Sequence, residues 1–393
     1  MNNRCPACGD SQMNSFYTLD KIPVHSVRLL YSRDEAIQFP SGSLDLALCP
    51  ACGFICNRAY NPDLQDYSAE YESTQAYSPT FNTFARKLAE SLIQRYDLHQ
   101  KDIIEIGCGQ GEFLSLLSEL GSNRGIGFDP AYDPARSAVS PSARVEIIPD
   151  YYSEKYTSTA ADFVCCKMTL EHIRDVADFI GTVRRSIGNR PDTTVFFQVP
   201  DVDRVLKEVA FWDIYYEHCS YFSLGSIARL FRSQGFEVQD LWHGYGDQYL
   251  MIDARPSSAP TTARLPQEND LDSIQSGVAA FQQRIPEVLG QWQKTIQDAA
   301  TQGQKVVLWG SGSKGVAFLT TLGLCDAIEY TVDINPNKHG TYMAGTGQKV
   351  VSPATMKAYR PDLVVLMNPL YEQEVREELS QYGLAPQIRS VGA

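Results

Sequence analysis

Four cysteines in the first part of the chain form two short repeats that could bind a metal ion. The repeats read Cys5-Pro6-Ala7-Cys8-Gly9 and Cys49-Pro50-Ala51-Cys52-Gly53. In each repeat the turn after the first cysteine directs two thiolates toward one point, and two such pairs supply the four ligands of a tetrahedral structural zinc ion. We therefore predict a zinc site with the ligands Cys5, Cys8, Cys49 and Cys52. Cys56 is expected to be a packed residue.

A glycine-rich turn further along the chain could hold a nucleotide-like cofactor. An apolar stretch over 102–106 runs into the pattern E-x-G-x-G-x-G, and an amphipathic helix follows. Glycine permits a tight turn and a close approach of the backbone to a ligand, and the helix start offers free N–H groups. Asp129 ends the next apolar stretch, 18 positions after Gly111. In a doubly wound fold, a carboxylate at that place binds ribose hydroxyls.

Two details favour S-adenosylmethionine over a dinucleotide at this turn. The last strand residue before the glycines is Glu105, which suits the ammonium group of methionine rather than a pyrophosphate. The glycines are also spaced G-x-G-x-G and not G-x-G-x-x-G. We predict a cofactor site that consists of Glu105, Gly107, Cys108, Gly109, Gly111 and Asp129, together with Asp150, Cys166 and Lys167 near the ends of later strands.

A third group of residues suits proton transfer. It lies in the segment Tyr215-Tyr216-Glu217-His218. An imidazole titrates near neutral pH, which makes His218 the natural general base. Glu217 could orient His218 or bind a substrate hydroxyl, although neighbouring residues of a strand point in opposite directions, so their joint action requires a turn here. Tyr215 and His172 could hold a keto or enolate oxygen. The other histidines are expected to be structural or surface groups: His25, His99, His243 and His339.

The pattern of apolar residues predicts the elements that position these groups. Residues recurring every three or four positions after Pro79 predict a helix that extends to Tyr96. Strands are predicted at 102–106, 125–129, 145–148, 162–166, 194–199, 236–241 and 249–254, with a helix at 224–234. A second strand–glycine turn–helix pattern begins at Val306, with further strands at 328–332 and 363–367. This indicates an α/β protein with two Rossmann-like units. The single G-x-G-x-x-G of the second unit is expected to serve packing or to face a phosphate, and not to bind NAD.

Taken in order, these parts resemble the sugar C-methyltransferases that act on nucleotide-linked 4-keto-deoxysugars. The strongest match is Tyr215–Ser223, which follows the family pattern Y-x-E-H-x-S-Y-F-S; His172 and the segment Val332–Gly340 also match. The resemblance implies a zinc-binding N-terminal domain, a class I methyltransferase domain and a C-terminal Rossmann-like domain that helps to hold the nucleotide-sugar. It also implies a functional tyrosine in the aromatic loop, which could be Tyr71 or Tyr77. The chain departs from the family at Tyr216, where the family has histidine, and in the sequence of its C-terminal glycine turn.

We predict five regions from these patterns. They are a zinc-binding domain at 1–65, an aromatic loop and lead-in helix at 66–98, an S-adenosylmethionine domain at 99–255, a linker with helices at 256–302, and a substrate-binding domain at 303–393.

Composition limits the class of protein and of partner. With 34 Lys+Arg against 47 Asp+Glu, the formal charge of −13 disfavours nucleic acid as a main partner. No apolar run approaches the ~20 residues that a membrane span needs, and no apolar N-terminal stretch resembles a signal peptide. We expect a cytoplasmic enzyme that methylates carbon in a small molecule, namely a nucleotide-linked keto-deoxysugar or a related natural-product precursor. Two alternatives remain at this point, namely methyl transfer to oxygen or nitrogen of a natural product, and a non-catalytic binding protein.

Overall fold

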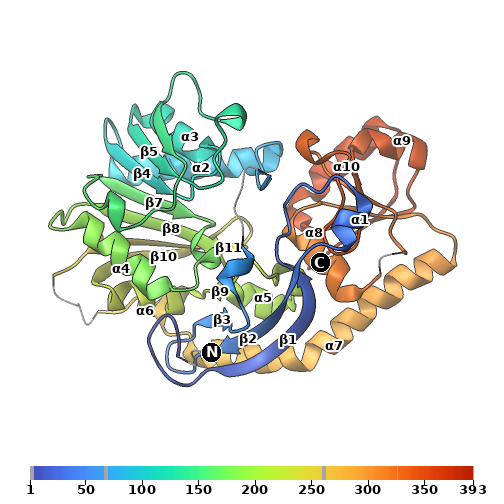
Figure 1. The fold of residues 1–393 in the computed structure, drawn as a ribbon, viewed down its shortest axis with the longest axis horizontal. Helices are drawn as coiled ribbons and strands as arrows, with labels where there is room; N and C mark the ends of the chain where they lie inside the picture. The colour runs from blue at the N-terminus through green and yellow to red at the C-terminus, as the bar shows by residue number, and fades with distance from the viewer. Residues whose placement is uncertain (1–3, 66–69, 259–262, 325, 393) are drawn as a thin grey trace.

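The computed structural model describes residues 4–65, 70–258, 263–324 and 326–392. Its strands form three sheets of four, seven and five strands (Figure 1). The sheets follow one another along the chain, except that the four-stranded sheet takes its last strand from the middle of the chain. Residues 66–69 of the predicted aromatic loop and 259–262 of the predicted linker lie outside the described residues.

The four-stranded sheet is formed mainly by the N-terminal region. Its strands β1 (Asn14–Pro23), β2 (Ser41–Leu48) and β3 (Ile55–Asn57) are antiparallel, and the short helix α1 (Arg33–Ile37) connects the first two. The fourth strand is β9 (Ser220–Tyr221), which comes from far along the chain and pairs with β3. The segment that carries the predicted general base is therefore fastened to the N-terminal region.

The seven-stranded sheet has the order β10-β11-β8-β7-β4-β5-β6. The five strands β8, β7, β4, β5 and β6 are parallel, while β11 and β10 form an antiparallel hairpin at the edge. The bounds of its elements are α2 (Pro79–Tyr96), β4 (Asp102–Ile106), α3 (Glu112–Gly121), β5 (Arg124–Phe128), β6 (Arg144–Ile148), β7 (Phe163–Lys167), α4 (Val176–Ile187), β8 (Thr194–Pro200), α5 (Val202–Glu208), α6 (Leu224–Ser233), β10 (Phe236–Gly244) and β11 (Tyr249–Pro256).

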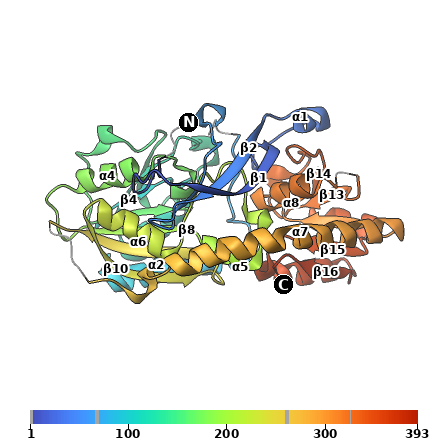
Figure 2. The same ribbon diagram turned by 90° about the horizontal axis from the view of Figure 1, so that it is seen from below.

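A long helix, α7 (Leu271–Thr301), runs from beneath the central sheet to the C-terminal sheet, as Figure 2 shows from below. The C-terminal sheet is entirely parallel, with the order β14-β13-β12-β15-β16. Its elements are β12 (Val306–Trp309), α8 (Ser313–Leu322), β13 (Tyr330–Val332), β14 (Lys349–Val351), α9 (Met356–Tyr359), β15 (Leu363–Leu366), α10 (Glu372–Gln381) and β16 (Gln387–Ser390).

The α/β class predicted from the sequence is confirmed, with two units of parallel strands and an N-terminal cysteine cluster. Each predicted strand has a counterpart, with bounds shifted by a few residues in several cases. The region predicted as a linker with helices, 256–302, contains the long helix α7. Within the described part of the chain, no helix is long and apolar enough to cross a membrane.

Candidate active site

A cavity of about 750 Å³ lies where the central and C-terminal sheets face each other. Its walls come from the glycine turn after β4, the irregular segment 71–78, the segment that contains His218, and the glycine turn after β12. Ligands of open α/β sheets bind at the carboxyl ends of the strands. Both glycine turns lie at the carboxyl ends of parallel strands. Residues of both turns line this one cavity.

The end of the cavity at the glycine turn after β4 contains a buried acid. Glu105 is 2% exposed, and its Oε2 has no hydrogen-bond partner among the described residues. Burial raises the pKa of this carboxyl to about 8, against the opposing charge of Lys167. A buried oxygen without a partner is unfavourable. The ammonium group of S-adenosylmethionine would supply the missing partner.

The glycine turn leaves room for a ligand at one position. Gly109 has a φ of +57°, and a Cβ built there would have its nearest neighbour, Glu112 Oε2, at 3.7 Å. The N–H of Gly109 donates to Asp129 Oδ2 at 2.8 Å, and Asp129 Oδ1 accepts from the N–H of Ala131 at 2.8 Å. Asp129 therefore holds the turn as well as lining the cavity.

Gly107 and Gly111 have different surroundings. Both have positive φ, and a Cβ would lie 1.9 Å from Thr169 Oγ1 at Gly107 and 2.7 Å from Ile147 Cδ1 at Gly111. Gly107 lines the cavity, whereas Gly111 is absent from the wall that the described residues form. The last glycine thus permits close packing of α3 against the strands.

Of the remaining predicted cofactor residues, some line the cavity and one does not. Cys108, Asp150 and Lys167 line the cavity. Cys166 is fully buried and does not belong to the described part of the wall. Side chains alternate along a strand, and Cys166 lies in the apolar core on the other side of β7. The structure thus places Lys167, and not Cys166, in the described wall of the cavity.

The segment 215–218 forms the turn that joint action of Glu217 and His218 requires. The N–H of His218 donates to the carbonyl oxygen of Tyr215 at 3.2 Å. The rings of Tyr215 and His218 have centroids 4.1 Å apart, and the ring of His172 is nearly perpendicular to that of His218 at 5.0 Å. All three side chains line the cavity. Burial lowers the pKa of His218 and of His172 below the ordinary imidazole value, so both rings are held uncharged.

Glu217 points away from His218. Its Oε1 lies 3.1 Å from His25 Nδ1, and its Oε2 accepts from the N–H of Ser26 at 2.9 Å and from the Ser26 hydroxyl. Tyr71 also bonds to this carboxylate. Burial opposes ionisation, yet the bonds from His25 and Ser26 lower the pKa of Glu217. Glu217 does not line the cavity within the described structure, so its charge acts through its neighbours.

Two tyrosines of the segment 71–78 line the cavity. Tyr71 lies with its ring 6.1 Å from that of His25. Tyr77 is 44% exposed, and its hydroxyl accepts from Asn337 Nδ2 at 3.4 Å. Tyr71 is the one of the two that is hydrogen-bonded to Glu217.

Tyr216, where the chain departs from the family pattern, is buried and accepts from the N–H of Asn61 at 2.8 Å. Its side chain lies outside the described cavity wall.

The C-terminal turn contributes a lysine. Lys314 Nζ lies 3.1 Å from Asp213 Oδ2 and 3.0 Å from Gln248 Oε1, and it lines the cavity. Asp333, which follows β13, accepts from the N–H groups of Ser311 at 3.0 Å and Asn335 at 2.9 Å. This carboxylate therefore links the glycine turn after β12 to the segment that follows β13.

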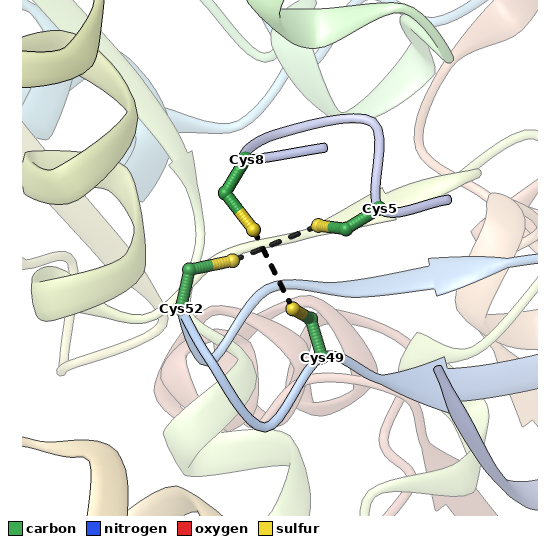
Figure 3. A group of neighbouring side chains, drawn as sticks. All are labelled: Cys5, Cys8, Cys49 and Cys52. Carbon is green, nitrogen blue, oxygen red and sulfur yellow. Dashed lines mark hydrogen bonds between the residues drawn. The ribbon is translucent and has the colours of Figure 1, made fainter. Parts of the chain in front are cut away.

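The four predicted zinc ligands come together (Figure 3). The Sγ atoms of Cys5 and Cys52 are 3.6 Å apart, as are those of Cys8 and Cys49. Zinc–sulfur bonds of about 2.3 Å in a tetrahedron imply sulfur atoms roughly 3.8 Å apart. The thiolate set therefore fits a zinc ion.

Comparison with known families decides the class of enzyme. Residues 81–241 match a methyltransferase domain, and residues 252–385 match a C-methyltransferase C-terminal domain. Over 400 aligned residues, the chain is 26% identical to the C-methyltransferase NovU of Streptomyces niveus, covering 97% of this chain and 93% of the relative. The chain is an S-adenosylmethionine-dependent C-methyltransferase. The non-catalytic alternative is therefore wrong.

Similar solved structures, which each match this chain over part of its length, include the following two proteins. The 1,6-didemethyltoxoflavin-N1-methyltransferase of Burkholderia thailandensis is 16% identical, with a TM-score of 0.36, over 46% of this chain and 82% of that chain. The PH0226 protein of Pyrococcus horikoshii is 17% identical, with a TM-score of 0.39, over 47% of this chain and 94% of that chain.

Sequence reasoning missed three residues near the site of the C-methyltransferase. His25 and Ser26 contact Glu217 from 192 and 191 residues away, and no local pattern marks either of them. Lys314 is the lysine of the second glycine turn, where a cation beside free N–H groups is a familiar signal for an anion. That signal could have identified Lys314 as a residue of the site.

Proposed function

We propose that this C-methyltransferase removes a proton from the carbon next to a ketone and methylates that carbon, on a nucleotide-linked deoxysugar. The observation that supports this most is the single cavity that joins the cofactor turn, His218 and the C-terminal turn. In this proposal the sugar lies beside His218, next to the cofactor, and the nucleotide extends toward the C-terminal glycine turn. The sequence resemblance to the sugar C-methyltransferases supports the same substrate class.

In this proposal His218 takes the proton. Its ring is uncharged and faces the cavity, so a nitrogen lone pair is available to a C–H bond beside a carbonyl group. The proton moves to the imidazole, the electron pair of the C–H bond forms a carbon–carbon double bond, and the π pair of the carbonyl group moves to its oxygen, which gives an enolate. A positioned general base contributes roughly 10²–10⁴ in rate.

The enolate oxygen needs donors. Tyr215 lies beside His218 in the cavity wall, and its hydroxyl can donate a hydrogen bond. His172 also lies beside His218, but its uncharged ring already uses its single N–H on the backbone carbonyl oxygen of Glu217. Glu217 acts as a positioning residue, because its carboxylate holds Tyr71 and is itself held by Ser26. When bound at the glycine turn, S-adenosylmethionine supplies an electrophilic methyl group. The protein aligns that group with the carbon nucleophile and excludes water.

Hydrogen exchange tests the carbon-acid step. In D₂O without cofactor, the enzyme should exchange the α-hydrogen of nucleotide-linked 4-keto-6-deoxysugars, read by mass spectrometry and NMR. The matched control is the same nucleotide-sugar with a 4-hydroxyl group, which has no acidic C–H bond and should not exchange. A product that carries its new methyl group on oxygen or nitrogen would contradict the proposal.

We also propose that zinc at the cysteine cluster is structural. The four thiolates leave no open position for a substrate. The second knuckle leads directly into β3, which pairs with β9 next to the catalytic segment. Loss of the ion should therefore disturb the active site as well as the N-terminal sheet.

Replacing one ligand tests this role. Cys5→Ser should lose zinc and unfold the region of β1 to β3, because a small metal-stapled sheet has little core of its own. Zinc content and thermal unfolding would be measured, with Cys56→Ala as the control, since Cys56 is buried outside the cluster. A Cys5→Ser protein that stays folded without metal would show that the ion is dispensable.

A further inference from the structure

A second group of metal-ligating side chains lies in the wall of the cavity. It consists of Glu171 and His172, in the short helical turn that follows β7, and of His218. One potential ligand atom from each lies within 4.8 Å of the others. All three residues line the cavity, so the atoms converge on a space that a ligand can enter.

Glu171 has no role in the fold that explains its position. It is 1% exposed, and neither of its carboxylate oxygens has a hydrogen-bond partner within the described structure. Polar atoms buried in this way nearly always bond to a neighbour, a water molecule or an ion. In the proposed methyl transfer Glu171 has no task either. The unpartnered carboxylate therefore points independently to a ligand.

The two imidazoles are arranged as metal ligands are. His172 bonds through its ring to the backbone carbonyl oxygen of Glu217, which fixes the orientation of the ring. A backbone carbonyl behind a histidine is a common support for metal-bound imidazole. The ring of His218 packs against the rings of His172, Tyr215 and Tyr221. These contacts hold the His218 ring through its faces and edges, so its position in the wall does not depend on a hydrogen bond from a ring nitrogen.

We propose that Glu171, His172 and His218 form a binding site for a divalent transition-metal ion such as Zn²⁺ or Co²⁺. Two imidazoles and one carboxylate suit these ions and leave positions open for water. Bonds of about 2.1 Å would draw the three ligand atoms to roughly 3.0–3.4 Å from one another, a contraction that side-chain rotation can supply. The donor set is nitrogen and oxygen, in contrast to the sulfur set of the cysteine cluster.

Occupancy of this site has a consequence for catalysis. That consequence rests on the proposed function, whereas the binding of the metal ion does not rest on it. A nitrogen that holds an ion cannot also take a proton. A bound ion would therefore block His218 as the general base and suppress α-hydrogen exchange. Excess zinc should inhibit the enzyme in competition with the keto substrate.

Cobalt binding to the full-length protein tests the site directly. Protein that retains its cysteine-bound zinc would be titrated with Co²⁺ and followed by visible absorption and metal analysis. We expect one cobalt per chain, with ligand-field bands but no thiolate-to-cobalt charge transfer. Glu171→Gln and His218→Asn should each weaken binding at least tenfold. The matched control is His99→Asn, because His99 is exposed and far from the cluster in the sequence, and it should bind as the wild type does.

Several results separate the site from the proposed function. No cobalt uptake by the wild type, or unchanged affinity in both ligand variants, would overturn the site. X-ray absorption of the cobalt-loaded wild type, which needs no variant to fold, should show only nitrogen and oxygen donors, and sulfur donors would also overturn it. If no keto-sugar undergoes exchange, the proposed function fails while the binding results still decide the site.

Discussion

Replacing His218 with alanine should lower turnover by a factor on the order of 10²–10⁴ and leave the affinity for S-adenosylmethionine near that of the wild type. The reason is geometric. His218 is brought into the cavity by the turn at 216–217, beside Tyr215 and His172, whereas the buried acid that suits the cofactor ammonium is Glu105 near the end of β4. The base and the cofactor site therefore come from separate elements.

The measurement is steady-state turnover together with calorimetry of cofactor binding. His99→Ala is the matched control, since it removes an exposed imidazole. Alanine at 218 also empties space beside Tyr215, so thermal unfolding would separate a loss of stability from a loss of catalysis. Turnover equal to that of the wild type would remove His218 from the role of base.

Features that depend on nearby residues could be predicted from the sequence. The glycine turn, its preceding acid and the two cysteine knuckles each depend on spacings of a few residues, and the structure brings each set together. The requirement for a turn between Glu217 and His218 also follows from local geometry, because side chains on a strand alternate. Local rules are sufficient where local backbone geometry determines the arrangement.

Features that depend on distant pairing could not be predicted. The strand β9 completes the N-terminal sheet by pairing with β3, so the region of the cysteine cluster and the segment that follows His218 share one sheet although they are far apart in the sequence. The sequence suggests that Glu217 orients His218 or binds substrate, but its carboxylate meets His25 and Ser26 instead. No periodicity reveals such partners, because they are selected by tertiary packing.

This pairing also changes how the N-terminal region is understood. His25 lies between β1 and β2 and contacts Glu217, while the Ser26 hydroxyl is 2.8 Å from that of Ser313 at the start of α8. The Ser26 hydroxyl thus lies within hydrogen-bond distance of both the Glu217 carboxylate and the Ser313 hydroxyl. The N-terminal region therefore contacts the catalytic segment and the C-terminal turn at the same point.

Gly109→Val should abolish binding of S-adenosylmethionine. The open space in front of Gly109, where a Cβ would meet nothing closer than Glu112 Oε2 at 3.7 Å, faces the cavity. A valine side chain would fill the space that the cofactor needs. It would also strain a backbone with φ of +57°, at a cost of about 1–2 kcal/mol for an ordinary residue.

A matched control separates these two effects. Gly383 has φ of +69°, and no atom lies within 4 Å of the place that a Cβ would occupy there, so Gly383→Val carries the same backbone strain away from the described cavity wall. By calorimetry, Gly383→Val should bind the cofactor normally, and Gly109→Val should show no binding while remaining folded. Normal binding by Gly109→Val would place the cofactor elsewhere, since no ligand can share that space with two methyl groups.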